Sequence, residues 1–256
     1  MKDKIFNDYF KVSQTFDLVK SILTFAMLIF SIVQVRYSIF YERDFTIFTA
    51  LFIIVKAILE NYQINTFNKG NKRKLDIFID NSFGTKKIPC YNSDNYYNNE
   101  EIELGATRML ANVHENTFFT SKISNISMIV YSILTIISVI ILSYLFLSYG
   151  LNEISALLLN FLITGTVLEK TIKYKDLYNK TVNIFERCND LCSDLRDNKE
   201  LNFYPRVITL FVEYESVKYE SKIVLSEKLF NKLNSNLSKE WEDIKSDYDI
   251  YKKYNE

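Results

Sequence analysis

The 256-residue sequence is poor in glycine and proline, with only five Gly and two Pro. Few residues can therefore break a helix or form a tight turn, which favours long helices over sheets. An excess of charge is also lacking, because Lys and Arg together number 31 and so do Asp and Glu. This balance gives no support to a protein that binds a DNA or RNA polymer.

Cysteine and histidine are equally scarce. Cys188 and Cys192 are four residues apart and would share one face of a helix, and the third cysteine is Cys90. The single histidine, His114, leaves the usual zinc ligand set incomplete. We expect reduced thiols, no metal and no cofactor. A removed signal peptide is not expected either, because the polar segment 1–15 shows no cleavage-site pattern.

No catalytic pattern occurs in the chain. It contains no Gly-rich phosphate-binding loop, no His-Glu-x-x-His pattern and no nucleophile elbow. The carboxylates are numerous but scattered, which is typical of solvated helix faces. The sequence therefore predicts no catalytic residues and no enzyme, because no group of residues fills the roles of an active site.

The strongest positive feature is the uncharged stretch 123–152. About 20 apolar residues in a helix cross the roughly 30 Å hydrocarbon core of a bilayer. Three shorter apolar blocks cover 21–35, 45–59 and 154–168. Their short connections favour two antiparallel hairpins, while the alternative makes the shorter blocks buried or interfacial helices. We expect an all-α membrane protein with four transmembrane helices and a mainly helical cytoplasmic region, with short strands left open.

The distribution of Lys and Arg predicts the orientation. Lys and Arg are frequent before residue 21, between the second and third blocks, and after residue 168, whereas the two short loops carry only Arg36 and Arg43. Both termini and the middle segment should therefore face the cytoplasm. The predicted parts are an N-terminal lead with the first hairpin (1–60), a cytoplasmic insert (61–121), the second hairpin (122–168), and a cytoplasmic stalk with a C-terminal helix (169–256).

The cytoplasmic insert contains two patterned segments. Leu75–Asp80 alternates in a way that fits a strand as well as a helical turn. Residues 100–114 predict a helix with acidic residues in its first turn and Asn98 or Asn99 as its N-cap.

The C-terminal part contains three patterned segments. An amphipathic helix is predicted over 169–196, and 207–222 is ambiguous between helix and strand. The apolar spacing from 230 to 251, which includes Leu237 and Trp241, is close to 3.5 and favours a packed helix. Its partner is either the same chain or a second copy.

Basic and aromatic residues suggest a ligand site in the cytoplasmic part. A basic cluster just past the second apolar block fits contact with anionic lipid and an orientation signal. It also fits binding of an anionic ligand whose bases stack on tyrosine rings. The predicted ligand residues are Lys72, Arg73, Lys74, Tyr96, Tyr97 and Arg206.

Polar residues inside the apolar blocks form two stripes. One contains Asn160 and Thr164, and the other contains Ser127, Thr135 and Ser138. Such residues serve either tight helix packing or the lining of a water path. Neither stripe is charged, so a wide constitutive channel is not indicated. Gln34 and Lys56 are further polar residues that a bilayer would penalise.

In layout, the chain resembles the four-transmembrane effectors found beside bacterial cyclic-oligonucleotide synthases in anti-phage defence. The likeness lies in the order of the two hairpins, in Leu75–Asp80, in Glu100–Ile102, and in the stretch from Tyr204-Pro-Arg206 to Tyr219-Glu220. The resemblance implies a bacterial inner-membrane effector. A cyclic oligonucleotide would bind its cytoplasmic part, after which homo-oligomers would permeabilise the membrane.

Two functions from other classes stay open on the residues alone. One is a small transporter or constitutive channel, which should provide an intramembrane charge partner for Lys56. The other is a membrane-anchored interaction protein that holds a partner through its C-terminal helices.

Overall fold

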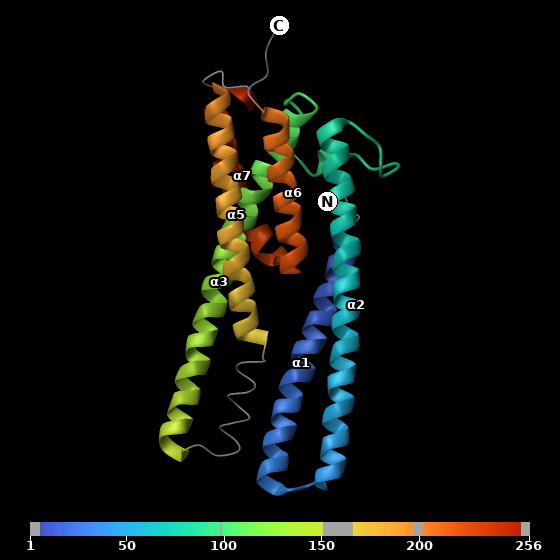
Figure 1. Cartoon of the computed structure of the whole chain (residues 1–256), viewed down its shortest axis with the longest axis vertical. Helices are drawn as coiled ribbons and strands as arrows, with labels where there is room; N and C mark the ends of the chain where they lie inside the picture. Colours follow the sequence, from blue (N-terminus) through green and yellow to red (C-terminus); the bar gives the residue numbers. More distant parts are fainter. Residues whose placement is uncertain (1–5, 98, 151–165, 197–201, 252–256) are drawn as a thin grey trace. The chain divides into compact units, whose positions relative to one another are not determined.

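The computed structural model describes residues 6–97, 99–150, 166–196 and 202–251, and within these ranges the chain is helical and contains no strand (Figure 1). The elements are α1 (Asn7–Tyr37), α2 (Glu42–Phe83), η1 (Ser93–Asn95), α3 (Ala106–Tyr149), α5 (Thr166–Arg196), α6 (Phe203–Ser221), α7 (Glu227–Asp247) and η2 (Asp249–Tyr251). The α-helical class is therefore confirmed, and the alternative of short strands is wrong for 75–80 and 207–222.

Local chemistry explains why α2 takes in the alternating segment 75–80. No glycine or proline interrupts the helix between Gly70 and Gly84, so it continues to Phe83. Gly84 then adopts a left-handed backbone with a φ of +65°, which suits the residue that follows a helix end. A Cβ atom there would also lie 3.0 Å from Leu104, so both conformation and space favour glycine.

The predicted start of the helix at Glu100 is wrong. Residues 100–105 form turns, and α3 begins at Ala106. The guanidinium group of Arg108 donates hydrogen bonds to the carbonyl oxygens of Glu100, at 2.8 Å, and Ile102, which satisfies the turn without a helix. Asn99 does not cap α3 either, because its amide donates inward to Asn112 at 2.9 Å.

The chain forms two compact units. Unit 1 contains Met1–Phe6, Gly70–Ile126 and Tyr174–Glu256, and unit 2 contains Asn7–Lys69 and Ser127–Lys173. Helices α2, α3 and α5 each contribute residues to both units.

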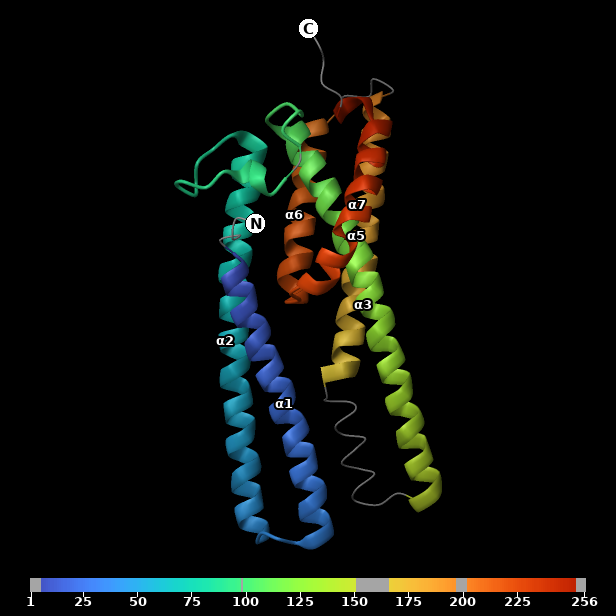
Figure 2. The same ribbon diagram turned by 180° about the vertical axis from the view of Figure 1, so that it is seen from behind.

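Unit 1 has an apolar core formed by α5, α6, α7, the first half of α3 and the end of α2; Figure 2 shows these helices from behind. Leu110 and Val113 of α3 are fully buried, and so is Val207 of α6. On α7, Leu237 and Trp241 are 4% and 1% exposed. Leu237 and Trp241 of the C-terminal helix are therefore buried within their own chain.

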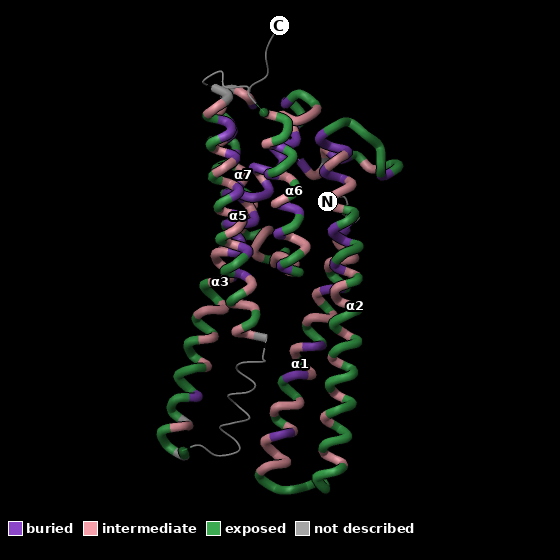
Figure 3. Tube along the Cα trace, viewed as in Figure 1, coloured by how far each residue is buried: buried purple, intermediate pink, exposed green. Residues whose placement is uncertain are grey.

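Unit 2 contains the long apolar helical stretches. α1, α2 and α3 are each long and apolar enough to cross a membrane. Within the most apolar window of each helix, no residue is buried in α2 and 11% are buried in α1 and in α3. Figure 3 shows this as long exposed runs on α2 and on the second half of α3. Most of the fourth predicted block, 154–168, lies outside the described residues.

Helices α1 and α2 lie side by side and are joined by a turn (Figures 1 and 2). Gln34 closes this turn, because its amide donates to the carbonyl oxygen of Phe40 at 2.7 Å and accepts from the Phe40 amide at 2.9 Å. The polar group of Gln34 thus has a local structural partner.

Candidate functional site

A buried charged cluster in unit 1 begins with Lys74 of α2. Its ammonium nitrogen lies 5.4 Å from the centre of the Tyr96 ring, within the range of a cation–π contact. Tyr96 follows η1, and its ring meets Tyr97 edge-on at 4.6 Å and Phe6 edge-on at 5.4 Å. The structure therefore brings together Lys74 and Tyr96, two of the residues that the sequence proposed for ligand binding.

Helix α6 supplies the opposite charge to the same cluster. The ammonium group of Lys218 donates to Oε1 of Glu215 at 2.6 Å, and both side chains are 11% exposed. Within the described part of the chain, the second oxygen of Glu215, Oε2, is buried without a hydrogen-bond partner, and so is Nδ2 of Asn71, one turn before Lys74. Leaving such atoms unpaired costs about 1–3 kcal/mol each, so the cluster offers both a donor and an acceptor to a polar ligand or water.

Burial disfavours the positive charges in this cluster. Desolvation lowers the pKa of Lys74, although Glu215 and Glu115 oppose the shift. Desolvation lowers the pKa of Lys218 to about 8. The positive charge of Lys74 acts in the same direction, whereas the negative charge of Glu215 opposes the shift. An additional anion would therefore stabilise both ammonium groups.

Glu115 of α3 completes the cluster electrostatically. Burial raises the pKa of its carboxyl group to about 7, while the hydrogen bond from Asn99, at 2.8 Å, favours the charged form. The Tyr96 hydroxyl has a raised pKa, because it is desolvated and faces the charges of Glu115 and Glu215.

The other predicted ligand residues lie elsewhere. Lys72 and Arg73 are exposed on α2. Tyr97 is only 2% exposed, its hydroxyl accepts a hydrogen bond from Asn116 at 3.0 Å, and its ring meets Phe78 edge-on. Stacking a base on Tyr97 would therefore require displacement of core side chains.

Arg206 is separated from the cluster along α6. Glu215 follows Arg206 by nine positions in α6, which equals about two and a half helical turns and places the two side chains on opposite faces. Arg206 instead donates to Asp194 of α5 at 2.7 Å.

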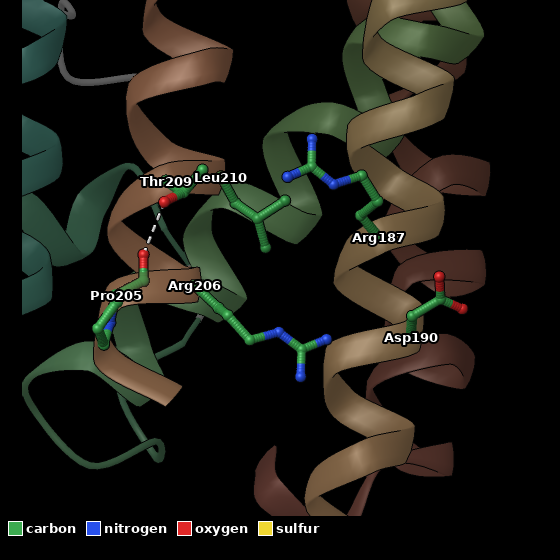
Figure 4. A pocket seen from close by; sticks show the side chains of 6 residues that line it. All are labelled: Arg187, Asp190, Pro205, Arg206, Thr209 and Leu210. Atoms are coloured by element: carbon green, nitrogen blue, oxygen red, sulfur yellow. Dashed lines mark hydrogen bonds between the residues drawn. The ribbon is translucent and has the colours of Figure 1, made fainter. Parts of the chain in front are cut away.

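A pocket of about 210 Å³ lies beside Arg206, between α5 and α6. Figure 4 shows the guanidinium groups of Arg187 and Arg206 reaching into the space between the two helices. Arg187 is paired with Glu213, and Asp190 also lines the pocket. Because both cations already have carboxylate partners and the pocket is smaller than the roughly 300 Å³ of a small ligand site, we interpret it as part of the α5–α6 interface.

The structure describes one of the two predicted polar stripes, Ser127, Thr135 and Ser138 on α3. The hydroxyl groups of Thr135 on α3 and Thr171 on α5 lie 2.9 Å apart, so Thr135 takes part in helix packing. Ser138 donates back to the Leu134 carbonyl at 2.8 Å, and Ser127 is 4% exposed. Asn160 and Thr164 lie outside the described residues.

Sequence reasoning missed Glu115, Glu215 and Lys218. Glu215 and Lys218 have the three-residue spacing of a helical ion pair, but that signal is visible only once 207–222 is known to be helical. Their electrostatic interaction with Lys74 depends on tertiary structure, because α2 and α6 are far apart in sequence.

The chain matches no family model, no curated protein and no solved structure. Within the described ranges, no group of three or more His, Cys, Asp or Glu side chains is placed to hold a metal ion.

Proposed function

We propose that this chain is a multi-pass membrane effector of anti-phage defence. Unit 1 binds an anionic nucleotide second messenger, copies of the chain associate, and the bacterial inner membrane becomes permeable. Both termini face the cytoplasm, and the charged cluster of unit 1 provides the ligand contacts.

The observation that carries the proposal is the inverted burial of α1 in unit 2. Its buried residues are all polar: Ser13, Lys20, Thr24 and Ser31. Seven large apolar side chains of the same helix are exposed: Val12, Leu18, Val19, Ile22, Phe25, Ile29 and Tyr37. Water penalises such a surface, whereas lipid solvates it.

The cluster of Lys74, Tyr96, Glu215 and Lys218 supports the proposed ligand class. Ammonium groups bind phosphate through charge-assisted hydrogen bonds, and a tyrosine ring stacks on a nucleobase. The unpaired Nδ2 atom of Asn71 adds a hydrogen-bond donor. A ligand that carries both phosphate and base would use all of these groups.

Helix α2 supports the proposed coupling between ligand binding in unit 1 and a change in the membrane. This helix carries both Lys74 and the exposed apolar stretch 45–59, and α3 and α5 also contribute to both units. A ligand that alters the packing of unit 1 therefore acts on helices that continue into the apolar unit. A change between two discrete packings of such helices is an established form of switching.

The test uses the whole 256-residue chain in liposomes that contain a trapped dye, with a panel of cyclic di- and trinucleotides. We expect leakage with one or a few of them. In direct calorimetric binding, Lys74→Gln and Lys218→Gln should each weaken affinity about 10- to 100-fold, the value of a hydrogen bond to a charged group. The exposed Lys72→Gln is the matched control and should bind like the parent.

Two outcomes would contradict the proposal. Leakage that needs no nucleotide would indicate a constitutive channel. Parental affinity in both Lys74→Gln and Lys218→Gln would remove the cluster from the ligand site. A further signature is proton uptake: because a bound phosphate raises the pKa of Lys218 from about 8, binding above pH 8 should take up protons, which calorimetry in two buffers measures.

A further inference from the structure

Unit 2 contains an ion-pair cluster that the ligand site does not use. Asp17 of α1 accepts a hydrogen bond from Lys170 of α5 at 2.7 Å. Its other oxygen lies 3.6 Å from Lys20 and 3.4 Å from the side-chain amide of Gln63 on α2. Lys20 also donates to Gln63 at 3.0 Å, so one carboxylate connects three helices.

The cluster lies at the ends of the apolar stretches. Asp17 precedes the block 21–35 by four residues, and Lys170 follows the block 154–168 by two. The side chains of Lys20, Asp17 and Lys170 are 10%, 25% and 27% exposed. Water and salt therefore screen this pair less than a surface pair, and removal of one partner leaves the other charge partly desolvated.

The same region of α5 is also tied to α3. Thr171 shares a hydrogen bond with Thr135, and the ammonium nitrogen of Lys170 lies 5.8 Å from the centre of the Tyr131 ring. The described beginning of α5 therefore contacts both α1 and α3.

We propose that the Asp17–Lys170 ion pair is a latch that holds α5 against α1 in the resting protein. Its separation accompanies membrane opening, so loss of either charge opens the membrane without a ligand. This regulatory role depends on the proposed function, but the latch itself is a statement about helix positions in unit 2 and has its own test.

Spin-label distances test the latch directly. Labels at Leu18→Cys and Ile172→Cys report on α1 and α5, since both side chains are 60% exposed. Cys90→Ser removes the exposed native thiol, and the other two cysteines are buried. In liposomes, Asp17→Asn and Lys170→Gln should broaden and lengthen the distance distribution. The exchanged pair Asp17→Lys with Lys170→Asp should restore it in part.

The matched control is Lys173→Gln. Among the described residues, Lys173 forms its ion pair with Glu169 of the same helix, and these side chains are 40% and 46% exposed, so the distribution should stay parental. Parental distances in both Asp17→Asn and Lys170→Gln would overturn the latch. A lengthening that the exchanged pair does not reverse would also overturn it, because the two charges would then not act as a pair.

Dye leakage without nucleotide tests the regulatory role. We expect the resting leak to rise about tenfold in Asp17→Asn and Lys170→Gln and to stay parental in Lys173→Gln. Parental resting leak in both single variants, with triggered leakage intact, would overturn the role of the latch in opening. If no nucleotide triggers leakage in the parent, the proposed function fails, while the distance measurement still decides whether the latch exists.

Discussion

Units 1 and 2 distribute apolar residues in opposite ways. In unit 1, Leu110 and Val113 of α3 are fully buried. Later in the same helix, within unit 2, Ile136 and Ile140 are 58% and 62% exposed. One helix therefore serves two environments, and the change occurs where the sequence loses its charges after Lys122.

Polar groups inside the apolar stretch of α1 bond differently from those in the core of unit 1. The hydroxyl groups of Thr24 and Ser31 bond to carbonyl oxygens one turn back in their own helix, whereas Asp17 and Lys170, which bond between helices of unit 2, flank the apolar stretches. In unit 1, His114 bonds to Asn189 at 2.8 Å and to Tyr251 at 3.2 Å, both far away in sequence. An apolar solvent requires local satisfaction of polar groups, whereas a water-soluble core tolerates long-range networks when every member is paired.

The largest expected effect comes from a core truncation in unit 1. Leu110→Ala should lower the free energy of unfolding by about 3 kcal/mol, within the usual range of about 2–5 kcal/mol for a fully buried leucine. Trp241, the single tryptophan, is buried in unit 1, so its fluorescence during chemical denaturation in detergent reports on this unit.

The matched control is Leu134→Ala in unit 2. Leu134 is 44% exposed and, on the proposed function, faces detergent or lipid before and after the change. Its effect should stay within about 0.5 kcal/mol. Equal losses in both variants would erase the distinction between the two units.

The next prediction concerns lysine substitutions at exposed apolar positions. Ile140 and Ile208 are 62% and 53% exposed, so burial alone predicts that lysine is tolerated at both. Lysine near the middle of a membrane helix costs about 2.5–3.5 kcal/mol, whereas a substitution at a site exposed to water changes stability by about 0.5 kcal/mol or less. Ile140→Lys should reduce the membrane-inserted fraction in a glycosylation-based insertion assay, while Ile208→Lys should leave expression and thermal stability parental.

Similar behaviour of the two variants would mean that one solvent surrounds both helices. The more conservative pair Ile140→Ser and Ile208→Ser should show the same order with a smaller difference, because serine carries no charge.

Much of the helical fold was predictable because its signals are local. The apolar blocks at 21–35 and 45–59 lie in α1 and α2, and the uncharged stretch after Lys122 lies in α3. The strand alternative for 75–80 and 207–222 is wrong, because a helix that is buried on more than one face also gives closely spaced buried residues. The adjacent residues Ile77 and Phe78 of α2 are both buried, and so are Tyr214 and Glu215 of α6. The start of α3 was misplaced because the Arg108 side chain, rather than a helix, satisfies the preceding turn.

The candidate site was only partly predictable. Lys74 and Tyr96 stood out by type and position, and they are close in space. Lys72 and Arg73 share their charge and neighbourhood in sequence but lie on the exposed face of α2, a difference set by the packing of unit 1. Glu115 and Lys218 could not be linked to Lys74, because no local pattern encodes contacts among α2, α3 and α6.

The network around His114 fixes its protonation state. Asn189 Oδ1 is an acceptor, so Nε2 of His114 carries the proton and donates at 2.8 Å. Nδ1 then accepts from the Tyr251 hydroxyl, which itself accepts from the thiol of Cys192 at 3.2 Å. The imidazole is neutral, and burial lowers its pKa to about 3 although the bond to Asn189 opposes the shift.

The smallest expected effect is the change of the parent protein's stability with pH, because the titrations of two neighbouring residues oppose each other. The pKa of His114 is about 3 in the folded chain and 6.5 in the unfolded chain. Between these values the unfolded chain binds the extra proton, so stability falls as pH falls.

The pKa of Glu115 is about 7 in the folded chain and 4.5 in the unfolded chain. Between these values the folded chain binds the extra proton, so stability rises as pH falls. The parent should therefore show an almost flat stability between pH 6.5 and 5.

Single variants separate the two contributions. From pH 6.5 to pH 5, Glu115→Gln should lose about 2 kcal/mol of unfolding free energy, because only the His114 term remains. Over the same interval His114→Gln should gain about 2 kcal/mol from the Glu115 term. Denaturation followed by Trp241 fluorescence at several pH values measures both slopes, and the double variant should return to a flat profile. Slopes of the same sign in the two single variants would mean that one of these side chains is solvated, and the core of unit 1 would then be more open than the burial of Leu110 and Trp241 implies.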